Sequence, residues 1–422
     1  MKFCTINLLY GLVLMCGSIN FGAIIAYGSA TLKVINAEFQ ISTFEYASFQ
    51  SIPAMISIFG PYLFNFLLAH LRRKVVVSII GCVGSGLWLL LLVMNKKYFW
   101  VAIIIRGFHG FILSGVSLTI PLYIAEIAPD DQKGFFSSLH PVSIALAHVM
   151  FNLIGVLHSW RYPIFVSSGF LLILGTCVWF IPDSPSDPKR TDEAAEDKKR
   201  RARESILSIR YRRNFIVSMV LMFSVQFSGI GAIMQNCSPL LSEVGLTIDS
   251  GYQAAMAVSA QLFTCFISSL LIDRFGGKLL WIVSSSGTSF MLLIYALNAG
   301  FNWSKWVPMF ALFGYQLSYG LGLSNVPFYI ITMFFPPDVK TVAMTIGISL
   351  NWVSATIVMF SLPYLQIWLG QFGLMLVFSG INLGCSLFGA IFIREKRLKN
   401  PQLEEEDRNR TIHASLIDSS NL

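Results

Sequence analysis

Long apolar stretches separated by short polar ones recur along the whole 422-residue chain. An apolar stretch of about 20 residues is what an α-helix needs to cross a bilayer, whereas the strands of a membrane barrel are shorter and alternate. We therefore predict an all-α membrane protein with twelve transmembrane helices. The predicted spans are residues 7–30, 46–69, 75–94, 99–126, 134–157, 162–182, 214–241, 252–272, 279–299, 306–335, 340–365 and 370–393.

One segment interrupts the pattern in the middle of the chain. Residues 183–213 are highly charged and nearly free of aromatic side chains, so they cannot insert into lipid. They divide the chain into an N-terminal six-helix bundle (1–182), a central linker (183–213), a C-terminal six-helix bundle (214–393) and a tail (394–422). The linker is expected to be solvated, or to form short amphipathic helices on the membrane surface.

Composition supports this prediction and narrows it. Only 12% of the residues are charged, against about 25% in soluble domains. With the N-terminus inside, most lysines and arginines fall in loops predicted to be cytoplasmic, as the positive-inside rule requires. The net charge of +8 is thus explained by topology, and no motif for nucleic acid is present.

Enzyme chemistry has no visible site in the sequence. The seven cysteines and six histidines show no metal-ligand spacing, and we find no phosphate-binding glycine loop and no nucleophile elbow. We expect neither enzymatic activity nor a cofactor or metal. Lys2 before an apolar stretch would fit a signal peptide, but the stretch is too long for a signal core.

Acidic and basic residues gather where the fourth span ends, in IPLYIAEIAPDDQKG at 120–134. Glu126 stands at the inner end of this span, and Arg72 and Arg73 stand at the inner end of the second. An ion pair there would tie helices together at the cytoplasmic mouth. Alternatively, Glu126 simply caps its helix end in water.

Several short motifs resemble those of one family. Residues 121–129 with Lys133–Gly134 resemble the signature P-x-Y-x-x-E-x-x-P followed by R-G. Residues 225–230 (VQFSGI) resemble Q-Q-x-S-G-I, residues 273–278 (DRFGGK) resemble D-R-x-G-R-R, and residues 181–185 (IPDSP) resemble P-E-S-P. Together they identify the chain as similar to the sugar porter family of the major facilitator superfamily. The resemblance implies two six-helix bundles related by a pseudo-twofold axis along the membrane normal.

The resemblance also implies a carrier with a solute site at mid-membrane between the bundles. Amides that donate and accept, and aromatic faces, suit a hydroxyl-rich solute. A lone polar residue in a span can instead serve helix packing. The expected substrate-binding residues are Gln226, Gln261, Asn351, Trp352, Phe328, Gln235, Asn236 and His140. The expected cytoplasmic gate residues are Glu126, Arg72, Arg73, Asp273 and Arg274.

The pocket departs from the family pattern. Pro141 replaces a sugar-contacting glutamine, and Gln235–Asn236 replaces a tyrosine pair, so glucose specificity does not follow. The expected function is alternating-access transport of a hexose or related polyhydroxylated solute, with a monosaccharide as partner. A carrier for another solute and a solute sensor without transport remain alternatives.

No Asp or Glu falls near the middle of any predicted span, which favours passive uniport over proton symport. His109, His140 and His148 are the groups that would otherwise couple transport to protons. We expect a monomer with both termini in the cytoplasm, in the plasma membrane.

Overall fold

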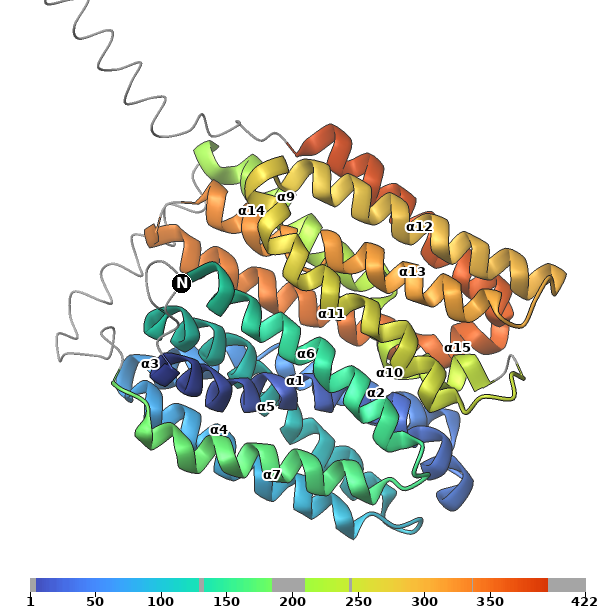
Figure 1. Cartoon of the computed structure of the whole chain (residues 1–422), viewed down its shortest axis with the longest axis horizontal. Helices are drawn as coiled ribbons and strands as arrows, with labels where there is room; N and C mark the ends of the chain where they lie inside the picture. The colour runs from blue at the N-terminus through green and yellow to red at the C-terminus, as the bar shows by residue number, and fades with distance from the viewer. Residues whose placement is uncertain (1–4, 129–132, 184–208, 243–244, 336, 394–422) are drawn as a thin grey trace, which may run out of the picture.

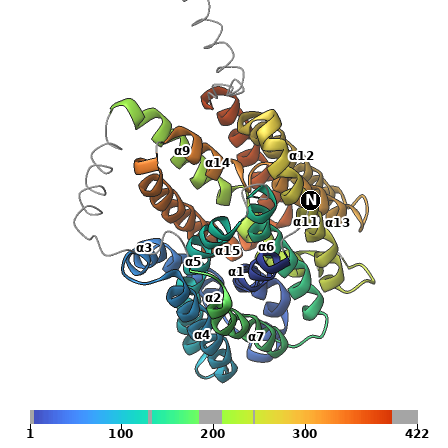
Figure 2. The same ribbon diagram turned by 60° about the vertical axis from the view of Figure 1, so that its left-hand side comes forward.

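The structure is a computed structural model that describes residues 5–128, 133–183, 209–242, 245–335 and 337–393. The described elements are α-helices and short 3₁₀ turns, arranged in two groups. Helices α1 to α7 form one group and α9 to α15 the other, and the two lie side by side (Figures 1 and 2).

The first group carries the first six predicted spans. Its helices are α1 (Thr5–Phe39), α2 (Thr43–Ser57), α3 (Gly60–His70), α4 (Arg73–Leu90) with the 3₁₀ turn η1 (Leu91–Val93), α5 (Phe99–Ile127), α6 (Lys133–Gly155), and α7 (Arg161–Cys177) with η3 (Val178–Phe180). The second predicted span is bent, because α2 and α3 meet at 41°.

The second group carries the other six. Its helices are α9 (Ile209–Phe227), α10 (Ile230–Ser242), α11 (Ser250–Phe275), α12 (Gly277–Phe301), α13 (Val307–Leu321), α14 (Val326–Phe334) and α15 (Pro337–Phe392). Gly370, at a φ of 62°, breaks α15 between the two spans predicted there. A straight helix of its 56 residues would be about 84 Å long, far more than one crossing requires.

By length and composition alone, seven helices in the described residues can cross a membrane, or eight if α2 and α3 form one span. α15 counts once in that number although it covers two predicted spans. The other three predicted spans coincide with α6, with α11 and with the pair α13–α14. Every predicted span is thus helical where the structure describes it.

Two boundaries differ from prediction. α1 continues to Phe39, nine residues beyond the predicted end, and a capping box of Ser42 with Glu45 then starts α2. α9 begins at Ile209, inside the predicted linker. Its first turn is basic rather than apolar, so hydropathy predicted a later start for the span. Residues 184–208, the tail beyond residue 393, and residues 129–132 of the predicted cytoplasmic turn lie outside the described residues.

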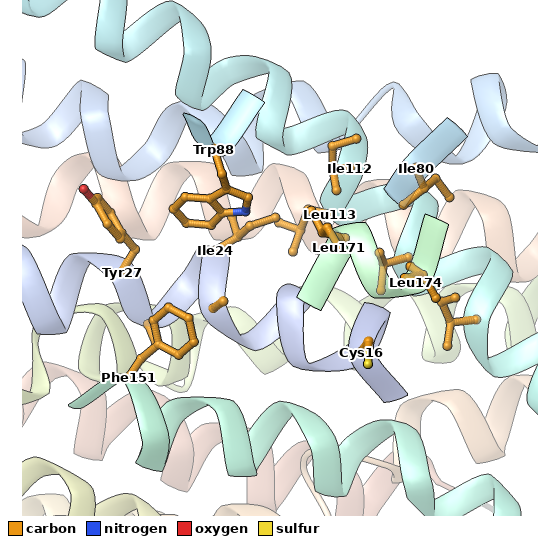
Figure 3. Close-up of a cluster of buried hydrophobic side chains, with 14 of the residues drawn as sticks. Cys16, Ile24, Tyr27, Ile80, Trp88, Ile112, Leu113, Phe151, Leu171 and Leu174 are labelled. Atoms are coloured by element: carbon orange, nitrogen blue, oxygen red, sulfur yellow. The ribbon is translucent and has the colours of Figure 1, made fainter. Parts of the chain in front are cut away.

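Each group has its own apolar core. In the first, Trp88, Ile112, Leu171 and Leu174 from α4, α5 and α7 pack against α1 (Figure 3). In the second, a separate cluster joins α9 to α15. Two cores agree with two bundles, while the exact domain limits at 182 and 213 stay a prediction.

Most contacts between the two groups are made by α6 with α11, α2 with α15, and α1 with α10, and α3 also touches α15. Trp352 and Met359 of α15 belong to the core cluster of the first group. The two halves therefore meet along these helices, which line the boundary between them. In carriers built from two such bundles, the solute site lies at this boundary.

Glycines set a close helix crossing in the first group. A Cβ atom at Gly81 of α4 would stand 2.5 Å from the Cα of Gly175 in α7. Backbones can approach this closely in a membrane only where both residues are small.

We expect Gly81→Val to lower the melting temperature of the purified protein by several degrees, because overpacking costs about 1–3 kcal/mol. Gly86→Val in the same helix is the matched control, since a Cβ there meets nothing within 4 Å. Equal melting temperatures for the two variants in detergent would contradict this account of the crossing.

Candidate functional site

Two predicted site residues form a direct amide pair in the second half. Gln226 of α9 donates from Nε2 to Oδ1 of Asn351 in α15 over 3.1 Å, and Asn351 donates to the carbonyl of Met222 over 2.9 Å. Gln226 lies one turn before the break at Gly229, whose φ is +93°. The pair ties the predicted site to an interrupted helix, as is common at transporter solute sites.

Trp352, the neighbour of Asn351, faces the first half of the molecule. Its ring lies 6.1 Å from that of Phe21 in α1, and Phe21 lies 5.9 Å from the ring of His140 in α6. Nδ1 of His140 is 2.7 Å from Oγ of Ser18. These contacts bring aromatic and polar side chains of both halves together near the middle of α1 and of the first crossing of α15.

Three predicted glutamines carry an unused acceptor. The Oε1 atoms of Gln226, Gln235 and Gln261 are buried and have no hydrogen-bond partner among the described residues. Gln226 and Gln235 lie close to the same residues. Met359 lies beside Gly231, as does Oε1 of Gln226, and the sulfur of Met359 accepts a hydrogen bond of 3.1 Å from Nε2 of Gln235. Buried carbonyl oxygens of this kind are costly unless a donor reaches them, and solute hydroxyls are such donors.

Asn236 does something else: it joins α10 to the first half. Its Oδ1 accepts from the hydroxyl of Tyr46 (2.6 Å) and from Nε2 of Gln50 (3.0 Å), and its Nδ2 donates to Oε1 of Gln50 (3.3 Å). Nearby, the amide of Ser238 donates to Ser29 over 3.0 Å. These bonds close the end of the boundary that the charge pattern predicts to be outside.

The local backbone explains this position. Pro239 has no amide hydrogen for the carbonyl of Gln235, so the helix departs from regular geometry at Asn236, where φ is −122° and ψ is 15°. The freed carbonyl of Gln235 lies 3.2 Å from where a Cβ would stand at Gly28 of α1. A kink in α10 and a glycine in α1 thus allow the two halves to touch.

At the predicted cytoplasmic end, Arg73 and Glu126 form a bidentate ion pair. Nε and Nη2 of Arg73 lie 2.6 and 2.5 Å from the two carboxylate oxygens, and both side chains are largely buried. Lys74 pairs with Asp183 at 3.0 Å, and the hydroxyl of Tyr123 donates to the carbonyl of Pro182 over 2.8 Å. The ends of α4, α5 and α7 are therefore tied together, and Glu126 is not a plain cap in water.

The other predicted gate residues are placed less tightly. Arg72 and Arg274 are exposed, with the guanidinium of Arg274 5.9 Å from the ring of Phe275. The side chain of Asp273 lies outside what the structure describes. Among the site residues, Phe328 is 41% exposed. Their roles, like those of the whole gate and site, stay predictions.

The remaining histidines of the spans are bound to backbone. Nδ1 of His109 lies 3.0 Å from the carbonyl of Ile105, and Nδ1 of His148 lies 2.8 Å from that of Ile144. A carbonyl only accepts, so each Nδ1 carries the proton. His140 differs, because its Nδ1 faces a hydroxyl that can donate or accept.

Sequence reasoning missed the first-half partners, namely Ser18, Phe21, Ser29, Tyr46 and Gln50. Gln50 was recognisable: it is a lone amide inside a predicted span, the criterion that selected Gln226 and Gln261. Gln253 and Gln316 also carry buried Oε1 atoms without a partner in the described part of the chain. Phe21 had no such signal, because an aromatic residue in a span is ordinary.

Residues 12–359, most of the chain, match the Major Facilitator Superfamily. The chain belongs to this superfamily. Major facilitator proteins are membrane transporters, so membership confirms the predicted fold class and the prediction that the chain is not an enzyme. Multi-pass membrane placement follows as well, whereas the particular membrane and the side of the termini stay predictions.

Named relatives and solved structures agree over most of the chain. It is 27% identical to sugar transporter ERD6-like 16 of Arabidopsis thaliana, with 93% of this chain and 88% of that protein covered. It is 25% identical to solute carrier family 2, facilitated glucose transporter member 2 of Bos taurus, with 85% and 77% covered. A crystal structure of a D-xylose–proton symporter superposes with a TM-score of 0.78 at 18% identity, with 92% and 98% covered. At that identity the superposition shows the shared fold.

We expect Glu126→Gln to destabilise this major facilitator protein by about 1.5–3 kcal/mol, because a buried charge-assisted bond is lost and Arg73 keeps its charge. Asp183→Asn is the matched control. Its carboxylate is 58% exposed, and an exposed pair contributes about 0–1 kcal/mol. Thermal unfolding in detergent measures both, and an equal loss in the two variants would show that burial of the Arg73–Glu126 pair is unimportant.

We expect Asn236→Ala to loosen the closed outer end, because Tyr46 and Gln50 lose their shared partner. Cys237, fully buried beside it, is an internal probe. Its alkylation by a membrane-impermeant maleimide should rise several-fold in Asn236→Ala. Cys237→Ser in the same background identifies the labelled thiol. Unchanged labelling would mean that these hydrogen bonds do not hold the outer end shut.

Proposed function

We propose that the chain moves a hexose or a related small polyhydroxylated solute across the membrane by alternating access, as a facilitative uniporter. Alternating access requires two bundles that rock about a fixed central site. The relatives named as sugar transporters and as a facilitated glucose transporter, together with the sugar porter motifs, support a sugar as the solute.

The observation that carries the proposal is the set of unused acceptors on Gln226, Gln235 and Gln261. Sugar hydroxyls donate to such oxygens and need no charge at the site. The rings of Phe21 and Trp352 supply the flat apolar surfaces that a pyranose ring packs against. The amide pair Gln226–Asn351 would then exchange a mutual bond for bonds to the solute.

Uniport is supported by where the charges lie. The described ion pairs, namely Arg73–Glu126, Lys74–Asp183, His158–Asp249 and Arg161–Glu38, all stand at helix ends or in loops. His109 and His148 use Nδ1 on backbone carbonyls of their own helices. None of these four ion pairs includes a residue that is predicted to bind the solute.

Proton symport is the second candidate, and His140 is the observation in its favour. The ring of Phe21 contacts both His140 and Trp352. The hydroxyl of Ser18, the partner of His140, can change from hydrogen-bond donor to acceptor when the imidazole gains a proton. The fold is also that of a D-xylose–proton symporter.

Uptake by the full chain in reconstituted vesicles tests the proposal. Labelled hexoses, pentoses and polyols should equilibrate without accumulating, and an inward proton gradient should leave the initial rate unchanged. Uptake of none of these solutes would refute sugar transport. Gradient-driven accumulation that His140→Gln abolishes would establish symport in place of uniport.

We also expect Gln226→Ala and Asn351→Ala to lower sugar uptake by about tenfold each, because each removes hydrogen bonds worth about 1–1.5 kcal/mol. Asn95→Ala, at a half-exposed amide after α4, is the control and should transport normally. Wild-type rates in Gln226→Ala and Asn351→Ala would place the solute elsewhere.

A further inference from the structure

An apolar groove of about 330 Å³ runs along α9 where it meets α15. Its lining consists of Phe215, Ile216, Met219, Val220, Phe223 and Leu350. Two lining side chains are open to the surroundings, Ile216 at 50% and Val220 at 37% exposure. A wall without hydroxyls, amides or charges does not suit a sugar path and suits hydrocarbon.

The groove together with Arg212 has about the length of one bilayer leaflet. From Arg212 to Phe223 the helix advances eleven residues, or about 16 Å at 1.5 Å per residue. The hydrocarbon core is about 30 Å thick, so this length covers about half of it. One lipid chain that enters at the interface would follow the groove to the bilayer centre.

Positive charge stands at the mouth of the groove. Arg212 is exposed and lies on the groove face of α9, three, four and seven residues before Phe215, Ile216 and Met219. Arg213 is exposed beside it. The sequence KKRRAR at 198–203 precedes them, on the side of the membrane predicted to be cytoplasmic.

We propose that this groove binds an anionic phospholipid of the adjoining leaflet. The phosphate and acidic headgroup lie against Arg212 and Arg213, and one acyl chain lies along α9 against Leu350. Basic residues immediately next to a membrane helix attract acidic lipids, each by roughly 1 kcal/mol. A neutral lipid would fill the same groove without that gain, so headgroup charge is what the site selects.

The place of the groove gives the lipid a structural consequence. It lies between the two helices that carry Gln226 and Asn351, on the side of α9 away from the core of the second half. A bound acyl chain would cover Ile216 and Val220. It would fill the space between α9 and α15 and so keep solvent out of it.

Native mass spectrometry of the full chain tests the proposal directly and needs no transport assay. The protein is taken from nanodiscs with equal amounts of phosphatidylcholine and phosphatidylserine, and the retained lipids are counted. Wild type should retain phosphatidylserine in preference. Arg212→Gln should lower that preference about fivefold, as loss of one such charge implies. Val220→Trp should remove the retained lipid by filling the groove.

Matched controls distinguish a specific lipid site from general effects of positive charge and side-chain size. Lys278→Gln in α12 removes a positive charge at the same end, and Val283→Trp adds a ring at another exposed valine, and both should behave as wild type. A loss in Lys278→Gln equal to that in Arg212→Gln would mean diffuse attraction and overturn the site. No preference for phosphatidylserine in wild type would overturn it too, whatever the uptake assay shows.

Discussion

Within a bilayer every backbone amide and carbonyl must find its partner inside the protein, and this constraint shapes the whole molecule. It makes helices obligatory, so the places where helices break are informative. In the second half breaks occur at Gly229, at Asn236 and between α13 and α14, and in the first half one occurs between α2 and α3. Gln226 lies just before the first of these breaks, and Gln235 lies just before the second. Irregular backbone is tolerated there because side chains of α1, α2 and α15 cover it.

Several hydrogen bonds across the boundary between the halves join neutral groups, beside the His158–Asp249 pair in the loops. Asn236 with Gln50, Ser238 with Ser29, and Asn65 with Thr345 all bridge it through neutral groups. Neutral bonds exchange for one another at a net cost of about 1 kcal/mol each, whereas a buried ion pair would cost far more to separate. The Arg73–Glu126 ion pair lies within one half, where it joins α4 to α5.

Sequence patterns were sufficient for the twelve spans, because hydropathy acts locally. They also named Arg72 and Arg73 as possible partners of Glu126, and the structure pairs it with Arg73. The sequence could not predict which residues cross the boundary. Asn236 bonds to Tyr46 and Gln50 of the first half, and its predicted contact with the solute stays a prediction. The bonds of Asn236 depend on the kink at Pro239 and on the absence of a side chain at Gly28, two features that come together only in the folded chain.

Arg106 ties three helices of the first half together. Its guanidinium is 1% exposed, and Nη2 donates to the carbonyl of Ile24 over 2.9 Å. The rings of Tyr27 and Phe49 lie 5.5 and 5.3 Å from its central carbon. A charge at membrane depth costs about 2.5–3.5 kcal/mol unless such groups surround it. Because they come from α1 and α2 while Arg106 belongs to α5, separating any of these helices would expose the charge.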